Sequence, residues 1–110
     1  VKFIKNNGDY LSNIKQIIPN KIGEIEFNGE ALKLHFQKNK NKAEQRERAN
    51  FAKTISKQLA IITDWFDLES NKIGFLRAKG KIIQIVITPT KNQTFFVKTY
   101  YISKNITQVW

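Results

Sequence analysis

His35 is the only histidine in this chain of 110 residues, and it lies in the stretch LKLHFQKNKNK (residues 32–42), which runs into lysines and asparagines. Imidazole is the side chain that most often transfers protons in catalysis, because its ordinary pKa lies near neutral pH. Lysine and arginine hold phosphate groups through charge and hydrogen bonds. A histidine and several cations in one place would therefore suit chemistry on a phosphodiester, provided that the fold brings them together.

RNA cleavage without a metal ion needs few protein groups, because RNA supplies its own nucleophile, the 2′-OH. The protein has to supply a base, an acid for the leaving oxygen, and cations or hydrogen-bond donors for the charge that grows on the phosphorane. We assign His35 as general acid or base, and we expect Arg77 and Lys98 to hold the phosphate. Tyr100 and Thr88 are expected to position the phosphate or to donate hydrogen bonds to it. His35 joins this set only if its own segment borders the sheet face that carries the others.

The distribution of charge favours a polyanionic partner. The formal net charge is +10, and residues 72–110 contain no acidic residue, whereas residues 58–71 contain three acidic residues and no basic one. Such a one-sided field favours nucleic acid first, and an anionic membrane surface or an acidic protein second. No stretch is apolar enough for a membrane helix. The residues that we expect to contact nucleic acid are Lys42, Arg46, Lys53, Lys57, Lys81 and Gln84.

Other kinds of chemistry lack the residues that they need. There is no cysteine, and a single histidine disfavours a structural zinc site. No glycine-rich phosphate-binding loop is present. A Mg²⁺-dependent nuclease needs converging carboxylates, and the two available sets are Glu24, Glu26 and Glu30, and Asp64, Asp67 and Glu69. We interpret the first set as cross-strand pairs and the second as solvated turn residues, so we expect neither a cofactor nor a metal.

The N-terminal third is predicted to form a short helix and then a β-hairpin. Asp9 suits an N-cap, the apolar residues from Tyr10 to Ile18 have helical spacing, and Pro19 would end the helix. Asn28-Gly29 is a strong hairpin signal. That hairpin would place Ile25, Phe27, Leu32 and Leu34 on one face, and Glu24, Glu26, Lys33 and His35 on the other. In the alternative that we prefer less, Asn28 caps a helix that runs through GEALKLHF (residues 29–36).

Residues 39–66 are predicted to contain a long amphipathic helix. Its apolar stripe consists of Phe51, Ile55, Leu59, Ile62 and Phe66, which recur with the helical period. The opposite, solvent-facing side carries Lys42, Arg46, Lys53 and Lys57. Glu44 and Arg48 form a supporting pair four residues apart.

Three strands are predicted after this helix, at residues 73–79, 81–88 and 94–103, and Pro89 ends the second. Alternation places Ile83, Ile85, Ile87, Phe95, Val97 and Tyr101 against the helix. It places Gln84, Thr88, Thr94, Lys98 and Tyr100 on the open side of the sheet. The tail ends in Val109 and Trp110, which either dock on the domain or remain exposed. The predicted architecture is an α+β domain with a twisted, mainly antiparallel sheet of four to five strands, one long helix on one face and a short N-terminal helix.

The stretch IGFLRAKGKIIQIVITPTKNQTFFVKTYYIS (residues 73–103), together with the long helix before it, resembles in layout the small toxin ribonucleases of the barnase–EndoU–colicin–RelE type. The resemblance covers about half of the chain and includes no defined motif, and no second histidine is present. It implies cleavage of tRNA or another structured RNA without metal, and an acidic immunity protein as partner. It also implies export with a larger chain and action in the cytoplasm of a target cell.

The length fits one domain, residues 1–110. Because the chain contains no methionine, not even at position 1, we expect it to be a domain of a longer chain or a processed fragment. The resemblance implies that it is the C-terminal module of that longer chain. Two other functions remain open at this point. One is a basic module that binds nucleic acid without cleaving it, and the other is an interaction domain for an acidic partner.

Overall fold

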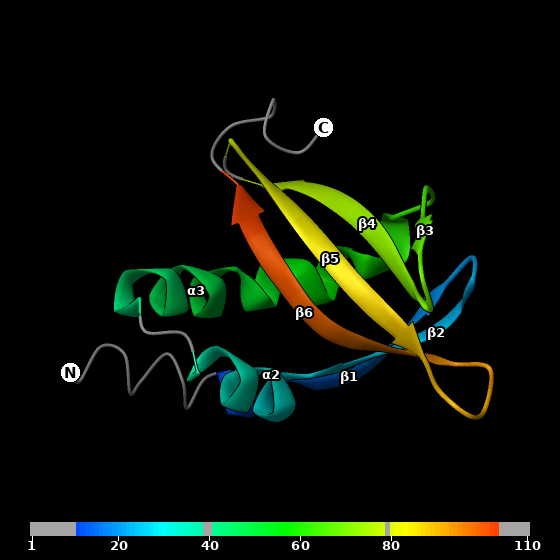
Figure 1. Ribbon diagram of the computed structural model, residues 1–110, viewed down its shortest axis with the longest axis horizontal. Helices are drawn as coiled ribbons and strands as arrows, with labels where there is room; N and C mark the ends of the chain where they lie inside the picture. The colour runs from blue at the N-terminus through cyan, green and yellow to red at the C-terminus, as the bar shows by residue number, and fades with distance from the viewer. Residues whose placement is uncertain (1–10, 39–40, 79, 104–110) are drawn as a thin grey trace.

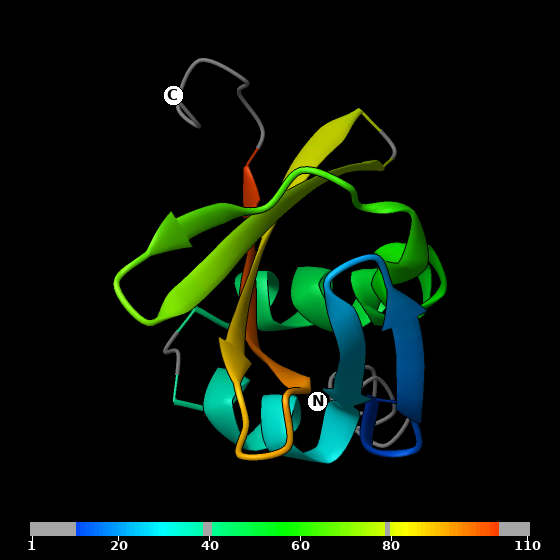
Figure 2. The same ribbon diagram turned by 90° about the vertical axis from the view of Figure 1, so that its right-hand side faces the viewer.

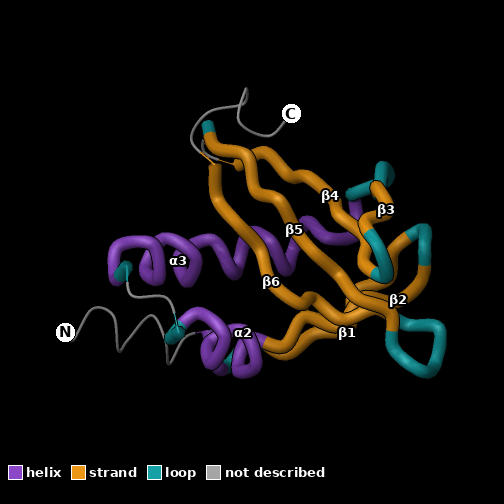
Figure 3. The backbone as a smooth tube through the Cα atoms, in the orientation of Figure 1, coloured by secondary structure: helices purple, strands orange, loops and turns teal. Residues whose placement is uncertain are grey.

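The computed structural model describes residues 11–38, 41–78 and 80–103, which form an α+β fold built on one six-stranded sheet (Figures 1 and 3). The elements in chain order are β1 (Lys15–Asn20), β2 (Gly23–Asn28), α2 (Gly29–Phe36), α3 (Lys42–Gln58), the 3₁₀ helix η1 (Leu59–Ile61), β3 (Phe66–Leu68), β4 (Asn71–Ala78), β5 (Lys81–Pro89) and β6 (Phe95–Ser103). The strand order is β1-β2-β6-β5-β4-β3, and only the β2–β6 pair is parallel. The predicted fold class is confirmed, with six strands in place of four or five.

The predicted N-terminal helix is wrong over most of its described length, because residues Lys15–Asn20 form the edge strand β1. Its proposed cap, Asp9, and Tyr10 lie outside the described residues. Within β1 only Ile18 is buried, at 7% exposed, whereas Ile17 before it is 66% exposed and Pro19 after it is exposed, as where one face of a strand meets the core. Pro19 is compatible with this strand because an edge strand does not need every backbone N–H for pairing.

The predicted hairpin at Asn28-Gly29 is also wrong, and the alternative helix is correct. The Oδ1 atom of Asn28 accepts hydrogen bonds from the backbone N–H groups of Glu30 at 3.1 Å and Ala31 at 3.3 Å, so Asn28 caps α2. Gly29 is required by close packing, because a Cβ atom there would lie 1.7 Å from the carbonyl oxygen of Leu11. The true hairpin pairs β1 with β2. Leu34, predicted to share a face with Leu32, is instead on the exposed side of α2, whereas Leu32 is buried.

The long helix is confirmed as α3, which continues into η1. Phe51, Ile55, Leu59 and Ile62 are buried as predicted. Phe66, the last residue of the predicted stripe, belongs instead to β3 and is half-exposed. The four cations on the predicted back of the helix, Lys42, Arg46, Lys53 and Lys57, are all exposed.

A single asparagine fixes the end of this helix to the sheet. The Nδ2 group of Asn20, at the end of β1, donates to the carbonyl oxygens of Leu59 at 2.7 Å and Ile62 at 2.9 Å. Its Oδ1 accepts a hydrogen bond from Nε1 of Trp65 at 3.2 Å. Trp65 in turn packs so closely over Gly74 of β4 that a Cβ atom there would lie 2.6 Å from its ring. These contacts fix the chain between η1 and β3.

The three C-terminal strands are confirmed as β4, β5 and β6, an antiparallel meander at the centre of the sheet. Figure 2 shows the twisted sheet curving around α3. The core lies between them, and its fully buried side chains include Ile83, Ile85, Ile87 and Val97. The predicted inward face of β5 is therefore correct. The Lys79 position of the turn and the tail residues Val109 and Trp110 lie outside the described part of the chain.

A β-bulge reverses the predicted faces of the last strand. Val86 pairs with Thr99 and Ile87 pairs with Val97, so Lys98 has no counterpart on β5. One extra residue changes which side chains point inward beyond it. Tyr100, predicted on the open face, is completely buried, whereas Tyr101, predicted to be in the core, is 45% exposed. Within the described residues, no helix is long and apolar enough to cross a membrane.

Candidate functional site: a cationic cluster beside the sixth strand

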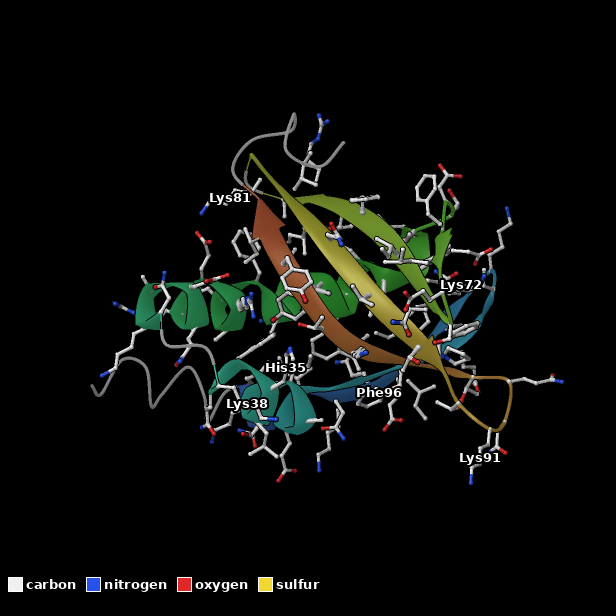
Figure 4. All side chains as sticks on the ribbon, in the orientation of Figure 1. His35, Lys38, Lys72, Lys81, Lys91 and Phe96 are labelled. Atoms are coloured by element: carbon white, nitrogen blue, oxygen red, sulfur yellow. The ribbon has the colours of Figure 1, made fainter. Side chains whose placement is uncertain are left out.

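One edge of β6 is only partly covered by β2, and the short helix α2 lies beside the remainder. The parallel pairing of β2 with β6 involves only Phe95 and Phe96 on β6. Beyond these residues, α2 and α3 contact the strand. Figure 4 shows His35 projecting from α2 toward β6, with Lys38 just after the end of the same helix. The fold thus places the only histidine beside the strand that carries Lys98.

Burial and neighbouring cations both lower the pKa of His35 below its ordinary value of 6.5. Partial desolvation is the largest cause, and the charges of Arg48, Lys38 and Lys98 follow in that order. Each of these influences disfavours the imidazolium form. At neutral pH, His35 is therefore a neutral imidazole that can accept a proton. We call His35, Lys38, Arg48 and Lys98 the His35 cluster.

Arg48 is the most firmly held member of the His35 cluster. Its guanidinium carbon lies 5.0 Å from the ring centre of Phe36 and 5.2 Å from that of Tyr101. Its Nη2 donates to Oε1 of Glu44 at 2.8 Å, and the Arg48 side chain is 6% exposed. Two aromatic contacts and an ion pair can stabilise a buried guanidinium. Arg48 is thus a fixed positive charge behind the more exposed lysines.

Two buried polar atoms of this region lack hydrogen-bond partners among the described residues. They are Nε of Arg48 and Oγ1 of Thr99, which is on β6. Buried polar groups in folded proteins are almost always hydrogen-bonded, and each exception calls for an explanation, of which a functional role is one. These two atoms add to the polar character of the region around the His35 cluster.

The bulge gives Lys98 an exposed position at the edge of this cluster. Bulges frequently redirect a side chain next to a functional site. Thr88 lies opposite Phe96, on the neighbouring strand β5, and Phe96 is two residues before Lys98. The fold therefore places His35 near Lys98, through α2 and not through the predicted hairpin, with Thr88 one strand away.

Arg77 and Tyr100 do not join the cluster in the predicted way. Arg77 is two strands away from β6 and pairs with Ile82, which in turn pairs with Ser103. From strand spacings, its backbone lies about 20 Å from that of Lys98. Tyr100 is buried and its hydroxyl donates to the carbonyl oxygen of Arg48. Burial raises the pKa of Tyr100 well above its ordinary value, so this hydroxyl remains neutral.

The predicted nucleic-acid contacts fall on different surfaces. The exposed cations Lys42, Arg46, Lys53 and Lys57 are on the side of α3 away from its buried stripe. Lys81 forms an ion pair with Glu47 and lies 5.8 Å from the ring centre of Phe51, so it connects β5 to α3. Gln84 is on the open face of the sheet, between Phe75 and Tyr101 on the neighbouring strands.

The sequence reasoning missed Arg48, Lys38 and Tyr101 as members or neighbours of the site. A signal for Arg48 was present, because it lies three residues before Phe51 and seven before Ile55, on the apolar stripe of α3. A charged residue on such a stripe needs a partner and is a candidate for function. Tyr101 carried no such signal, because the bulge cannot be deduced from alternation alone.

The carboxylates considered for a metal site are dispersed over the fold. Glu24 and Glu26 are exposed on β2, Glu30 forms an ion pair with Lys15, and Asp67 forms one with Lys72. The predicted pairing of this first set across a hairpin with Lys33 is wrong, because Lys33 is in α2. Among the described residues, no three histidine or acidic side chains are grouped in a way that could hold a metal ion.

Comparison of the chain with protein-family models, curated proteins and solved structures gives no match.

Proposed function

We propose that this domain cleaves RNA without a metal ion and that the His35 cluster is its active site. The observation that carries the proposal is the position of His35 on α2 beside β6, near three cations from α3, β6 and the end of α2 that lower the pKa of its ring (Figure 4). A neutral histidine can accept a proton, and the cations can bind a phosphate group. The combination fits phosphodiester chemistry better than it fits a purely structural role.

In the proposed reaction, His35 accepts the proton of the RNA 2′-OH, and the 2′ oxygen attacks the adjacent phosphorus. The bond between phosphorus and the 5′ oxygen then breaks, and the departing oxygen takes a proton from water. The products are a cyclic 2′,3′-phosphate and a free 5′-OH. Lys98 and Lys38 contact the phosphate oxygens, and the buried charge of Arg48 stabilises the negative charge that accumulates on them.

The open sheet face next to the cluster suits the bases of an unpaired RNA strand. Tyr101 is half-exposed there, and Phe96 is partly exposed beside Thr88. Aromatic side chains stack on splayed bases, and proteins recognise single-stranded RNA largely in this way. Tyr101 also contacts Arg48. A base stacked on Tyr101 would therefore lie close to the phosphate-binding cations.

The biological setting that we propose is a toxin module that acts on tRNA or another structured RNA and is neutralised by an acidic partner protein. The net charge of +10 supports both interactions, because RNA and an acidic inhibitor would approach the same positive surface. In this proposal the domain is exported with a larger chain and acts in the cytoplasm of a target cell.

A second function, RNA binding without cleavage, is favoured by the exposed aromatic side chains Phe66 and Tyr101. Aromatic residues and cations suffice for binding, which should weaken steeply as salt is added. In that case His35 would have no special importance. The two functions are thus separated by a test for cleavage.

The test is incubation of purified protein with a mixture of cellular RNAs, with and without EDTA. We expect cleavage in both conditions, and a loss of at least about 100-fold in rate for His35→Ala. Lys98→Ala should lose most of the activity as well. Lys21→Ala is a matched control, because it removes an exposed lysine from the turn between β1 and β2, and it should cleave like the wild type.

Each outcome of this experiment has a distinct meaning. Loss of wild-type activity in EDTA would contradict the metal-free mechanism. Intact RNA after long incubation with folded protein would overturn the enzymatic function and leave binding alone. Equal effects of the Lys98 and Lys21 substitutions would show that general charge, and not the His35 cluster, determines activity.

A further inference from the structure

The middle of the open sheet face carries a polar side chain between two aromatic ones. Gln84 on β5 pairs with Tyr101 on β6 and with Phe75 on β4. Residues that pair directly across neighbouring strands project from the same face, with Cβ atoms about 4.5–5.5 Å apart. These three side chains therefore form a row across the sheet.

The burial pattern of β5 places this row on the open face. Ile83 and Ile85, the neighbours of Gln84 along the strand, are fully buried in the core. Successive residues of a strand point to opposite faces, so Gln84 points away from the core. Its side chain is partly exposed, and a ligand on the open face can reach it.

The side-chain amide of Gln84 forms no hydrogen bond with any of the described residues. A primary amide carries one oxygen that accepts hydrogen bonds and an NH₂ group that donates them. The amide of Asn20 uses both groups within the fold, because it donates to two backbone carbonyl oxygens and accepts from Trp65. Gln84 has no such structural role, so its donor and its acceptor are both available to a ligand.

This row adjoins the His35 cluster through Tyr101. The ring centre of Tyr101 lies 5.2 Å from the guanidinium carbon of Arg48, and Tyr101 is 45% exposed. A base that stacks on Tyr101 would therefore have its phosphate near the cations of the cluster. Because Gln84 is directly opposite Tyr101, its amide can reach the edge of that same base.

We propose that Gln84 selects the base that stacks on Tyr101, and that the selected base is adenine. The inference rests on the proposed function, because it concerns the RNA that the His35 cluster would cleave. Adenine is the usual partner of a glutamine amide, which accepts a hydrogen bond from its 6-amino group and donates one to the adjacent ring nitrogen. In single-stranded RNA the edges of the bases are open to such contacts.

The test is a fluorescence anisotropy titration of the whole domain with hexanucleotides of 2′-O-methyl RNA, whose blocked 2′ oxygen cannot attack the phosphorus. The parent contains only uridine, and three others carry adenine, guanine or cytosine at the third position. The strand can shift along the site until its adenine reaches Gln84. We expect the adenine hexanucleotide to bind at least about fivefold more tightly than each of the others, the lower end of what two base-edge hydrogen bonds provide.

Two changes remove the amide contact, one from each side. In the ligand, unsubstituted purine replaces adenine, so that the 6-amino group is lost and the two rings remain for stacking. In the protein, Gln84→Met removes both hydrogen-bonding groups at similar size and without a change in charge. Each change should reduce the affinity for the adenine position to that of the guanine hexanucleotide. Gln16→Met makes the same substitution on the exposed edge strand β1, three strands away, and should retain the preference for adenine.

The outcomes separate this inference from the function on which it rests. A preference for adenine that survives Gln84→Met would overturn the inference. So would equal binding of the adenine and purine hexanucleotides by the wild type, because stacking alone would then explain the preference. A Gln84→Met variant that binds every hexanucleotide more weakly by the same factor would also overturn it, since Gln84 would then contribute no selectivity. These three results leave the proposed function standing, whereas folded wild-type protein that binds none of the hexanucleotides would overturn both.

Discussion

Replacing Tyr100 by phenylalanine separates the structural role of its hydroxyl from the catalytic role that the sequence suggested. The hydroxyl donates to the carbonyl oxygen of Arg48, in the middle of α3, and the whole side chain is buried. The ring packs edge-on against Phe36 at 5.1 Å and stacks on Phe27 at 6.4 Å between centres. Phenylalanine retains these ring contacts and loses only the hydrogen bond.

The expected cost is about 1 kcal/mol in the free energy of unfolding, the usual net value of one buried hydrogen bond. The cost is not larger because the Arg48 carbonyl oxygen, within α3, also accepts the N–H of Ala52 in α-helical geometry. For a domain of this size, 1 kcal/mol lowers Tm by about 4–6 °C. Urea and thermal unfolding measure both quantities. RNA cleavage by the folded variant should be unchanged.

The same substitution makes a second prediction for alkaline solution. Burial raises the pKa of Tyr100 in the folded protein, whereas an unfolded tyrosine ionises near about pH 10. Above that pH the unfolded state binds fewer protons than the folded state, so stability falls as pH rises. The slope for one tyrosine is about 1.4 kcal/mol per pH unit. Tyr100→Phe removes this contribution, so the stability difference from the wild type should shrink as pH rises above 10.

The opposite pattern would refute this reasoning. A Tyr100→Phe variant with wild-type stability and no RNA cleavage would show that the hydroxyl takes part in the chemistry. A stability difference that stays constant from neutral to strongly alkaline pH would show that Tyr100 is exposed enough to ionise in the folded state.

Two further substitutions test the fold that positions the site. Gly74→Ala places a methyl group 2.6 Å from the ring of Trp65, and we expect a loss of about 1–3 kcal/mol by urea unfolding; an unchanged midpoint would contradict this packing. Asn28→Ala removes the cap of α2 and should cost about 1 kcal/mol, measured in the same way. Asn28→Asp keeps a capping oxygen, so this variant should retain most of the stability that Asn28→Ala loses. If Asn28 were in a hairpin turn, the aspartate variant would not be more stable than the alanine variant.

The parts of the fold that could be predicted are those with long, regular patterns. Helix α3 was identified because its apolar residues repeat over four turns, and β5 because it is almost entirely β-branched. The predictions for the N-terminal region were wrong for two local reasons. Pro19, which usually ends a helix, lies here in an edge strand. Asn28-Gly29 is equally suitable for a hairpin turn and for a helix start, and tertiary packing against Leu11 decides between them.

The candidate site was only half predictable, because it depends on geometry that alternation does not encode. His35 and Lys98 were expected to meet only if their segments were adjacent, and the helix α2 brings them together by a different route from the predicted hairpin. The bulge at Lys98 exchanged the positions of Tyr100 and Tyr101. The prediction that Arg77 lies beside Lys98 was wrong, because two residues on the same face of a sheet can still be far apart along the strands.

The most direct test of the His35 cluster is an NMR titration of the His35 ring, whose signals are unambiguous because the chain has no other histidine. In the free protein, the pKa should lie below 6.5, because desolvation and three nearby cations disfavour the charged ring. A saturating DNA dinucleotide, which lacks the 2′-OH and is not cleaved, should raise this pKa because its phosphate brings a negative charge to the cluster. A pKa at or above 6.5 in the free protein, or one that the dinucleotide does not change, would contradict the proposed phosphate-binding site.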